Sequence, residues 1–255
     1  HIIDSINSID NNNQNQNQKQ NELSDIAVYD NYKYKCNCES FKWHINNGLS
    51  QPYPRELKII TNYLKSNPNK NNLYIDIGGH FGTTSIPYSK LFKNIHVFEP
   101  NKENFDLLNF NIKMNGIKNI YSHNYGIYNK TTNAICERHD NNSGSIVMKE
   151  VDKPTSDSIQ MLALDSIQFN DKVDFIKIDT EGSELYVLQG AQSIIDNHKP
   201  LIQVETNHCS QKFFNYDKNE IYNFMYSMNY KILDDDGNDP IFYYDSDLKS
   251  SNILI

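Results

Sequence analysis

The sequence predicts an α/β fold in which a mostly parallel sheet is covered by helices on both faces. Short apolar runs alternate with amphipathic segments between residues 72 and 229, which is the pattern of successive β-α-β units. Acidic residues and glycines follow several of the apolar runs, where the strands should end. Ligands of open parallel sheets bind beyond the carboxyl ends of the strands. The sequence therefore predicts both a fold class and the edge of the sheet that carries a site.

The first half of the sheet is predicted from three apolar runs and two helical patterns. Phe105, Leu108 and Ile112 recur at helical spacing, and Gly116 follows as a C-terminal cap. Pro87 stands near the start of a helix, where proline is tolerated. The elements expected here are strands at 72–79, 94–100 and 119–124, and helices at 84–92 and 101–115.

The second half begins with a polar stretch, 130–165, whose β-prone patches predict hairpins or a loop over the site. A buried strand follows, and then a helix with Leu185, Leu188 and Ile195 on one face. The remaining expected elements are strands at 172–179 and 200–206, helices at 183–196 and 217–229, and closing strands at 230–236 and 251–255.

Charge and cysteine usage exclude several classes of partner. The net charge is −8, so nucleic acid, which needs clustered Lys and Arg, is not expected as a partner. Cys36 and Cys38 are one residue apart, the wrong spacing for a zinc site, and free thiols are expected. No apolar run has the length of a membrane span and no signal-peptide pattern is present, so we expect a cytoplasmic protein.

The segment DIGGHFG (76–82) predicts a ligand-binding turn. Asp76 ends a strand, Gly78, Gly79 and Gly82 allow close approach of the backbone, and Glu99 ends the next strand, where it can accept hydrogen bonds from a ribose. The dinucleotide pattern GxGxxG is not met. An acid before the first glycine favours a ligand with a cationic amino-acid tail over a pyrophosphate. The pattern therefore favours S-adenosylmethionine over NAD.

Several segments together resemble the FkbM-type methyltransferases. They are YIDIGGHFGTTS, HVFEPNKENFDLLNFNIKMNG, LDSI, VDFIKIDTEGSELYVLQGAQSII and KPLIQVET, in this order. The resemblance implies a Rossmann-like class I methyltransferase with a seven-stranded sheet, its last strand antiparallel, and methyl transfer from S-adenosylmethionine to a hydroxyl. The cofactor-binding residues expected on this basis are Asp76, Gly78, Gly79, His80, Gly82, Glu99, Pro100, Asn124, Asp179 and Glu181.

The length fits one domain with a tail. Residues 11–20 are almost wholly Asn and Gln, so residues 1–24 are expected to be a disordered tail. Residues 25–70 are expected to form an N-terminal helical cap and residues 71–255 the catalytic core.

The stretch VDFIKIDTEGSEL (173–185) places a lysine inside an apolar strand. Lys177 and Asp179 share one face of this strand, because side chains alternate with a period of two. A central parallel strand is covered on both faces, so Lys177 should be buried and paired with Asp179, Glu181 or Glu205. Glu184 is more simply a helix N-terminal residue.

Methyl transfer to an alcohol needs a group that takes or loosens the hydroxyl proton. The candidate catalytic residues are Asp179, Lys177, Glu205 and His208, with His208 as a possible base. Asp179, Glu205 and His208 could instead hold a divalent cation.

The acceptor is expected to be a sugar hydroxyl of a glycan or glycoconjugate, since 17 Tyr and 12 Phe suit stacking on sugar rings. Asn142 and Ser143, in DNNSGSI (140–146), resemble the family's loop near the substrate, with a plain turn as the alternative. DDDGND (234–239) is interpreted as a solvated turn. Alternatives are O-methylation of a small natural product or a non-catalytic binding module; the oligomeric state is left open.

Overall fold

The computed structural model describes residues 26–29, 31–36, 54–138, 145–206 and 210–247. The expected tail at 1–24 and the expected closing strand at 251–255 lie outside these ranges. Within them, no helix is long and apolar enough to cross a membrane. Cys36 and Cys136 are free thiols.

The centre of the molecule is a seven-stranded sheet with the order β12-β13-β11-β10-β3-β4-β5. Neighbours from β11 to β5 pair in parallel, whereas β13 is antiparallel to both β11 and β12. The predicted sheet, with its last strand antiparallel, is confirmed. Its strands are β3 (Leu73–Ile77), β4 (Asn94–Phe98), β5 (Ile120–His123), β10 (Val173–Ile178), β11 (Leu201–Val204), β12 (Tyr230–Asp234) and β13 (Ile241–Tyr244).

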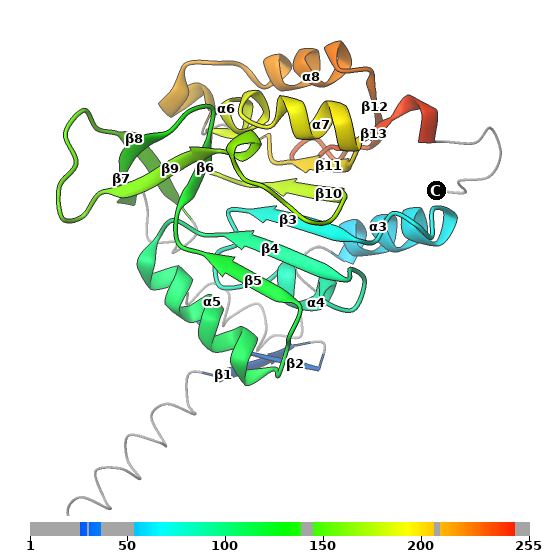
Figure 1. The fold of residues 1–255 in the computed structure, drawn as a ribbon, viewed down its shortest axis with the longest axis horizontal. Coiled ribbons are helices and arrows are strands. Elements are labelled where there is room, and N and C mark those ends of the chain that lie inside the picture. The colour runs from blue at the N-terminus through cyan, green and yellow to red at the C-terminus, as the bar shows by residue number, and fades with distance from the viewer. Residues whose placement is uncertain (1–25, 30, 37–53, 139–144, 207–209, 248–255) are drawn as a thin grey trace, which may run out of the picture.

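The two faces of this sheet carry different side chains. One face is aliphatic, with Ile75 and Ile176 packed against α6, α7 and α8; the other is aromatic, with Tyr74 and Phe175 packed against α3, α4 and α5. Figure 1 shows these two helical layers on opposite sides of the sheet. The helices are α3 (Pro54–Ser66), α4 (Ser85–Tyr88), α5 (Lys102–Met114), α6 (Glu184–Gln189), α7 (Gln192–His198) and α8 (Lys218–Ser227), with short turns η1 (Leu164–Ser166), η2 (Ser210–Phe214) and η3 (Asp245–Asp247).

Two predicted helices differ in extent from those observed. The one at 84–92 is confined to α4, and the one at 183–196 is divided into α6 and α7 at Gly190. A Cβ atom on Gly190 would lie 2.0 Å from the carbonyl oxygen of Tyr128. The helix therefore breaks where it meets the backbone of a neighbouring strand.

A second sheet of four strands, in the order β6-β9-β7-β8, occupies the stretch where hairpins or a loop were expected. In Figure 1 the arrowheads of β3, β4, β5 and β10 point toward the side where this small sheet lies. It therefore lies at the edge of the central sheet that carries the strand ends. Its strands are β6 (Gly126–Tyr128), β7 (Thr132–Arg138), β8 (Ile146–Glu150) and β9 (Ile159–Ala163).

The described part of 25–70 is not wholly helical. It contains a hairpin, β1 (Ile26–Tyr29) and β2 (Tyr32–Lys35), as well as α3. The backbone N–H of Lys35 donates to the side chain of Asn111 on α5, at 2.7 Å. Tyr32 and Tyr34 are buried while Lys33 is exposed, which is the period-two pattern of a strand with one face buried.

Candidate active site

The end of β3 and the turn after it form the first part of the site. Asp76 is buried, and its Oδ2 accepts a hydrogen bond from the Ser85 hydroxyl. Its other oxygen, Oδ1, is also buried and accepts no hydrogen bond of normal geometry within the described residues, although the Tyr74 hydroxyl lies near enough to lower the pKa of Asp76. Burial raises the pKa of Asp76, and the Lys177 charge and the Ser85 hydrogen bond oppose that shift. Asp76 thus lies, enclosed by protein, at the strand end where a ligand is expected.

Gly78 brings the ends of β3 and β10 into contact. Its φ is +85°, and a Cβ atom there would lie 1.7 Å from the carbonyl oxygen of Asp179. Only glycine adopts this conformation without cost and leaves room for that carbonyl. Gly78 therefore sets how closely the turn after β3 approaches Asp179.

Glu99, at the end of β4, holds the glycine turn. Its Oε2 accepts from the backbone N–H of His80 and its Oε1 from that of Asn101, both at 2.8 Å. Burial raises the pKa of Glu99 to about 7, although the two N–H groups lower it. Both oxygens are thus already used by the protein, each with a lone pair left over. The expected hydrogen bonds to a ribose stay a prediction.

Asn124 and His80 complete this part of the site. The Asn124 side-chain amide donates to the carbonyl oxygens of Glu99 and Pro100, at 2.9 and 3.0 Å. The His80 ring packs on Phe81 with 4.1 Å between ring centroids, and burial lowers its pKa to about 4. His80 is therefore neutral at physiological pH.

Lys177 is buried in β10, with 2% of its side chain exposed, and its Nζ lies 2.7 Å from Oδ2 of Asp179. The strand register sets it opposite Asp76 on β3 and Gln203 on β11. A buried ammonium needs such a partner, because isolated buried charge is costly. Pairing with Glu181 or Glu205 as a second partner stays a prediction.

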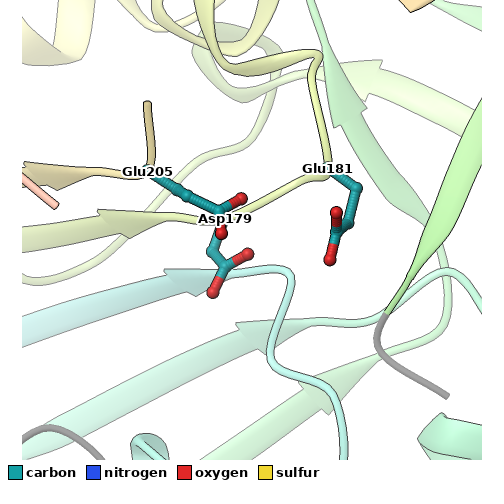
Figure 2. Close-up of side chains that lie close together, drawn as sticks. All are labelled: Asp179, Glu181 and Glu205. Atoms are coloured by element: carbon teal, nitrogen blue, oxygen red, sulfur yellow. The ribbon is translucent and has the colours of Figure 1, made fainter. Parts of the chain in front are cut away.

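Asp179, Glu181 and Glu205 form a cluster of carboxylates beyond the ends of β10 and β11. Each offers an oxygen, and these oxygens lie within 4.8 Å of one another. Figure 2 shows the three side chains extending toward a common region. The backbone N–H groups of Asp179 and Glu205 continue the sheet ladder, to Ile77 and Ile178 respectively. Burial raises the pKa of Glu205 well above its ordinary value, and the Asp179 charge adds to that rise.

Glu184 has a structural role that the sequence indicated only in outline. Its Oε1 accepts from the N–H and hydroxyl of Thr180 and from the N–H of Gly182, at 2.9 to 3.0 Å. The Tyr216 hydroxyl donates to the Gly182 carbonyl at 2.7 Å. These bonds fix the loop that presents Glu181.

Asp239 is a further acidic residue near the site. Burial raises its pKa to about 6, the Lys177 charge lowers it, and the Asp179 charge raises it. The segment containing it was interpreted as a solvated turn, an interpretation that fits the exposed Asp235 and Asp236 but not the half-buried Asp239. No local pattern in the sequence indicates its burial, because β13, which follows it, pairs with the distant strand β11.

Three predicted site residues, namely His208, Asn142 and Ser143, lie outside the described residues. The cation set expected from the sequence was Asp179, Glu205 and His208; among the described residues Glu181 lies beside the first two.

The strand order and the acidic, glycine-rich strand ends define the class I methyltransferase fold. More narrowly, the sequence matches the family model of the methyltransferase FkbM domain over residues 76–232, which is more than half of the chain. The chain belongs to this family, and the resemblance found in the sequence is confirmed.

Solved structures with a similar arrangement include methyltransferase FkbM from Methylobacillus flagellatus KT (22% identity, TM-score 0.49, 69% of this chain and 44% of that one). M. jannaschii TYW2, solved with AdoMet, is 12% identical (TM-score 0.42, 86% and 85%). A methyltransferase from Streptococcus mutans, solved with SAH, is 10% identical (TM-score 0.44, 71% and 95%). The chain thus spans less than half of the FkbM structure it matches. No curated protein sequence matches it significantly.

Proposed function

We propose that this protein is an S-adenosylmethionine-dependent O-methyltransferase whose acceptor is a sugar hydroxyl of a glycan or glycoconjugate. Family membership supports methyl transfer. The donor, the hydroxyl and the sugar are the proposal, and each is supported by a different group of residues.

The ends of β3 and β4 suit the methyl donor. S-Adenosylmethionine supplies a methyl group on a positively charged sulfur and also carries a cationic amino group. Oδ1 of Asp76 is buried and accepts no hydrogen bond of normal geometry within the described residues, so an ammonium group would satisfy it. Glu99 and Asn124 hold the turn and the adjoining backbone in one shape before any ligand arrives. These residues would bind the donor with little reorganisation.

The observation that carries the proposed reaction is the buried Lys177–Asp179 pair beside Glu205. The ion pair fixes the position of the Asp179 carboxyl group at the end of a central strand. The raised pKa of Glu205 makes it a better proton acceptor than a free carboxylate once it is ionised. An alcohol is a poor nucleophile, so a positioned acceptor for its proton is what transfer to a hydroxyl requires.

Aromatic rings near the acidic loop support a sugar as the acceptor. Tyr186 on α6 lies 5.0 Å from Tyr128 and 6.0 Å from both Phe214 and Tyr216, measured between ring centroids. Tyr216 is also bonded to the loop that presents Glu181. Aromatic faces stack on the C–H faces of sugar rings, so an acceptor hydroxyl could reach the carboxylates from here.

The test is transfer of labelled methyl from S-adenosylmethionine to a panel of hexose and deoxysugar glycans, with small alcohol-bearing natural products as the comparison set. We expect a product methylated on oxygen in the glycan set. Donor binding without transfer to any glycan, or transfer to nitrogen or carbon, would refute the proposal.

A further inference from the structure

The carboxylate cluster, defined as Asp179, Glu181 and Glu205, gathers three acidic side chains beyond the ends of two neighbouring strands. Lys177 pairs with Asp179 at 2.7 Å. Asp179, Glu184, Glu181 and Asp239 all act on Glu205 as neighbouring negative charges. Like charges held this close repel strongly where water is excluded. The arrangement calls for a cation in addition to Lys177.

A second observation concerns polar atoms that lack partners. Oε2 of Glu205 is enclosed and accepts no hydrogen bond from the described residues. Gln203, two residues earlier in the chain and on β11, is 1% exposed, and within the described residues neither its amide oxygen nor its nitrogen has a hydrogen-bond partner. Buried polar groups are nearly always paired with protein, water or an ion. Oε2 of Glu205, which belongs to the cluster, therefore needs a partner that the described residues do not supply.

We propose that the carboxylate cluster binds a divalent cation of the hard, oxygen-preferring kind, such as Mg²⁺, Mn²⁺ or Ca²⁺. Oxygens on opposite sides of Mg²⁺ are about 4.2 Å apart and those around Ca²⁺ about 4.6 to 5.2 Å apart, twice their bond lengths. The cluster's oxygens lie within 4.8 Å of one another, so they can reach one ion with small side-chain movements.

The backbone around the cluster suits a preformed site. Asp179 and Glu205 are held by ladder hydrogen bonds, and the Glu181 loop is held by Glu184. Three protein carboxylates leave coordination positions for water and one further oxygen. Resting on the proposed function, that oxygen is the acceptor hydroxyl, which the cation would orient and acidify.

The competing occupant is the cationic methyl donor itself. The two can be separated, because the donor depends on Asp76 and Glu99 whereas the cation depends on Glu181 and Glu205. Binding of Mn²⁺ alone, without donor or acceptor, therefore tests the cation site.

The experiment titrates the full chain with Mn²⁺ and follows the free ion by electron paramagnetic resonance. Wild type should bind Mn²⁺, and Mg²⁺ or Ca²⁺ should displace it. Glu181→Gln and Glu205→Gln should each weaken binding at least tenfold. Asp196→Asn, which removes an exposed carboxylate on α7, should not, and circular dichroism should show all variants folded.

Two results would overturn the proposal: no Mn²⁺ binding at millimolar concentration, or equal binding by wild type and both cluster variants. Its failure is distinct from that of the proposed function. Undiminished glycan methylation in EDTA, without Mn²⁺ binding, rejects the cation and keeps the O-methyltransferase. Mn²⁺ binding that the variants lose, without glycan methylation, keeps the cation and rejects the acceptor.

Discussion

The carboxylates at the ends of β3 and β4 differ from those at the ends of β10 and β11 in the hydrogen bonds that they accept from the protein. At the ends of β3 and β4, Glu99 accepts one backbone N–H on each oxygen and Asp76 accepts the Ser85 hydroxyl. At the ends of β10 and β11, Asp179 is paired with Lys177, and Oε2 of Glu205 accepts no hydrogen bond from the described residues. Glu99 is therefore bonded to the protein through both oxygens and Asp76 through one, whereas Glu205 receives fewer hydrogen bonds from the protein than Glu99 does.

This difference indicates two different roles for the carboxylates. A carboxylate bonded to backbone N–H groups fixes the shape of a loop, which serves a ligand that must be held in one orientation. A carboxylate without donors is ready to accept a proton or to bind a cation. In the proposed function, the ends of β3 and β4 bind the donor and the ends of β10 and β11 carry the chemistry, and β3 and β10 approach each other at Gly78.

Among the substitutions considered, the largest effect is expected at Gly78, where the ends of β3 and β10 are in contact. Gly78→Ala would place a methyl 1.7 Å from the Asp179 carbonyl oxygen at a φ of +85°. We expect a loss of about 3 to 5 kcal/mol in unfolding free energy, from backbone strain and forced displacement. Urea denaturation would measure it, and calorimetry should show donor binding lost.

Gly116→Ala is the matched control. Its φ is +66°, but nothing lies within 4 Å of the added atom, so only the strain remains, about 1 to 2 kcal/mol. Equal losses in the two variants would show that the contact with Asp179 is unimportant.

The second effect follows from the pKa of Glu99. Burial raises it from 4.5 to about 7, so the folded chain binds this proton more tightly than the unfolded chain does. The resulting stabilisation is complete below pH 4.5 and is lost as the pH rises through 7. Glu99→Gln should remove this loss. Between pH 4.5 and 7, the unfolding free energy of the variant should therefore rise relative to that of wild type by up to about 3 kcal/mol.

Urea unfolding of both proteins between pH 4.5 and 7.5 would measure the difference, in which other titrating groups cancel. Donor affinity of the wild type should increase over the same range, because ribose hydroxyls donate best to an ionised carboxylate. Parallel stability profiles for the two proteins would contradict the assigned shift.

The third effect tests the other pair of strand ends. Lys177→Met keeps most of the stem volume but removes the charge from Asp179. We expect turnover to fall well over tenfold while donor affinity changes less, because Asp76 and Glu99 remain. Lys172→Met, exposed just before β10, is the control. Turnover near the wild-type level in Lys177→Met would show that the lysine only packs.

Much of this arrangement could be predicted, because it depends on local patterns. Apolar runs ending in Asp76, Glu99 and Asp179 place three acids at one edge of a parallel sheet. A lysine inside such a run must be buried and paired. The number of strands and the antiparallel direction of the last one came from the family resemblance, whereas the strand β13 was not predicted at its observed position.

Other features depend on contacts between distant segments, which spacing does not reveal. Glu99 was assigned to a ribose, but its oxygens accept from His80 and Asn101. The break at Gly190 is set by the Tyr128 carbonyl on β6. Asp239 approaches the site because β13 pairs with β11, a consequence of topology.

The smallest effect is expected from two asparagines at opposite ends of β5, each of which donates its side-chain amide to two backbone carbonyl oxygens. Asn124 donates to the carbonyl oxygens of Glu99 and Pro100, and Asn119 donates to those of Ser89 and Phe92. Alanine at either position removes both bonds, at about 1 kcal/mol per bond, so thermal unfolding should show similar losses. Only Asn124 holds backbone at the donor end, and losing about 1 kcal/mol of preorganisation there should weaken donor binding roughly fivefold. Calorimetry on both variants separates stability from binding: equal donor affinities would show that the β3 and β4 ends need no help from Asn124 to keep their shape.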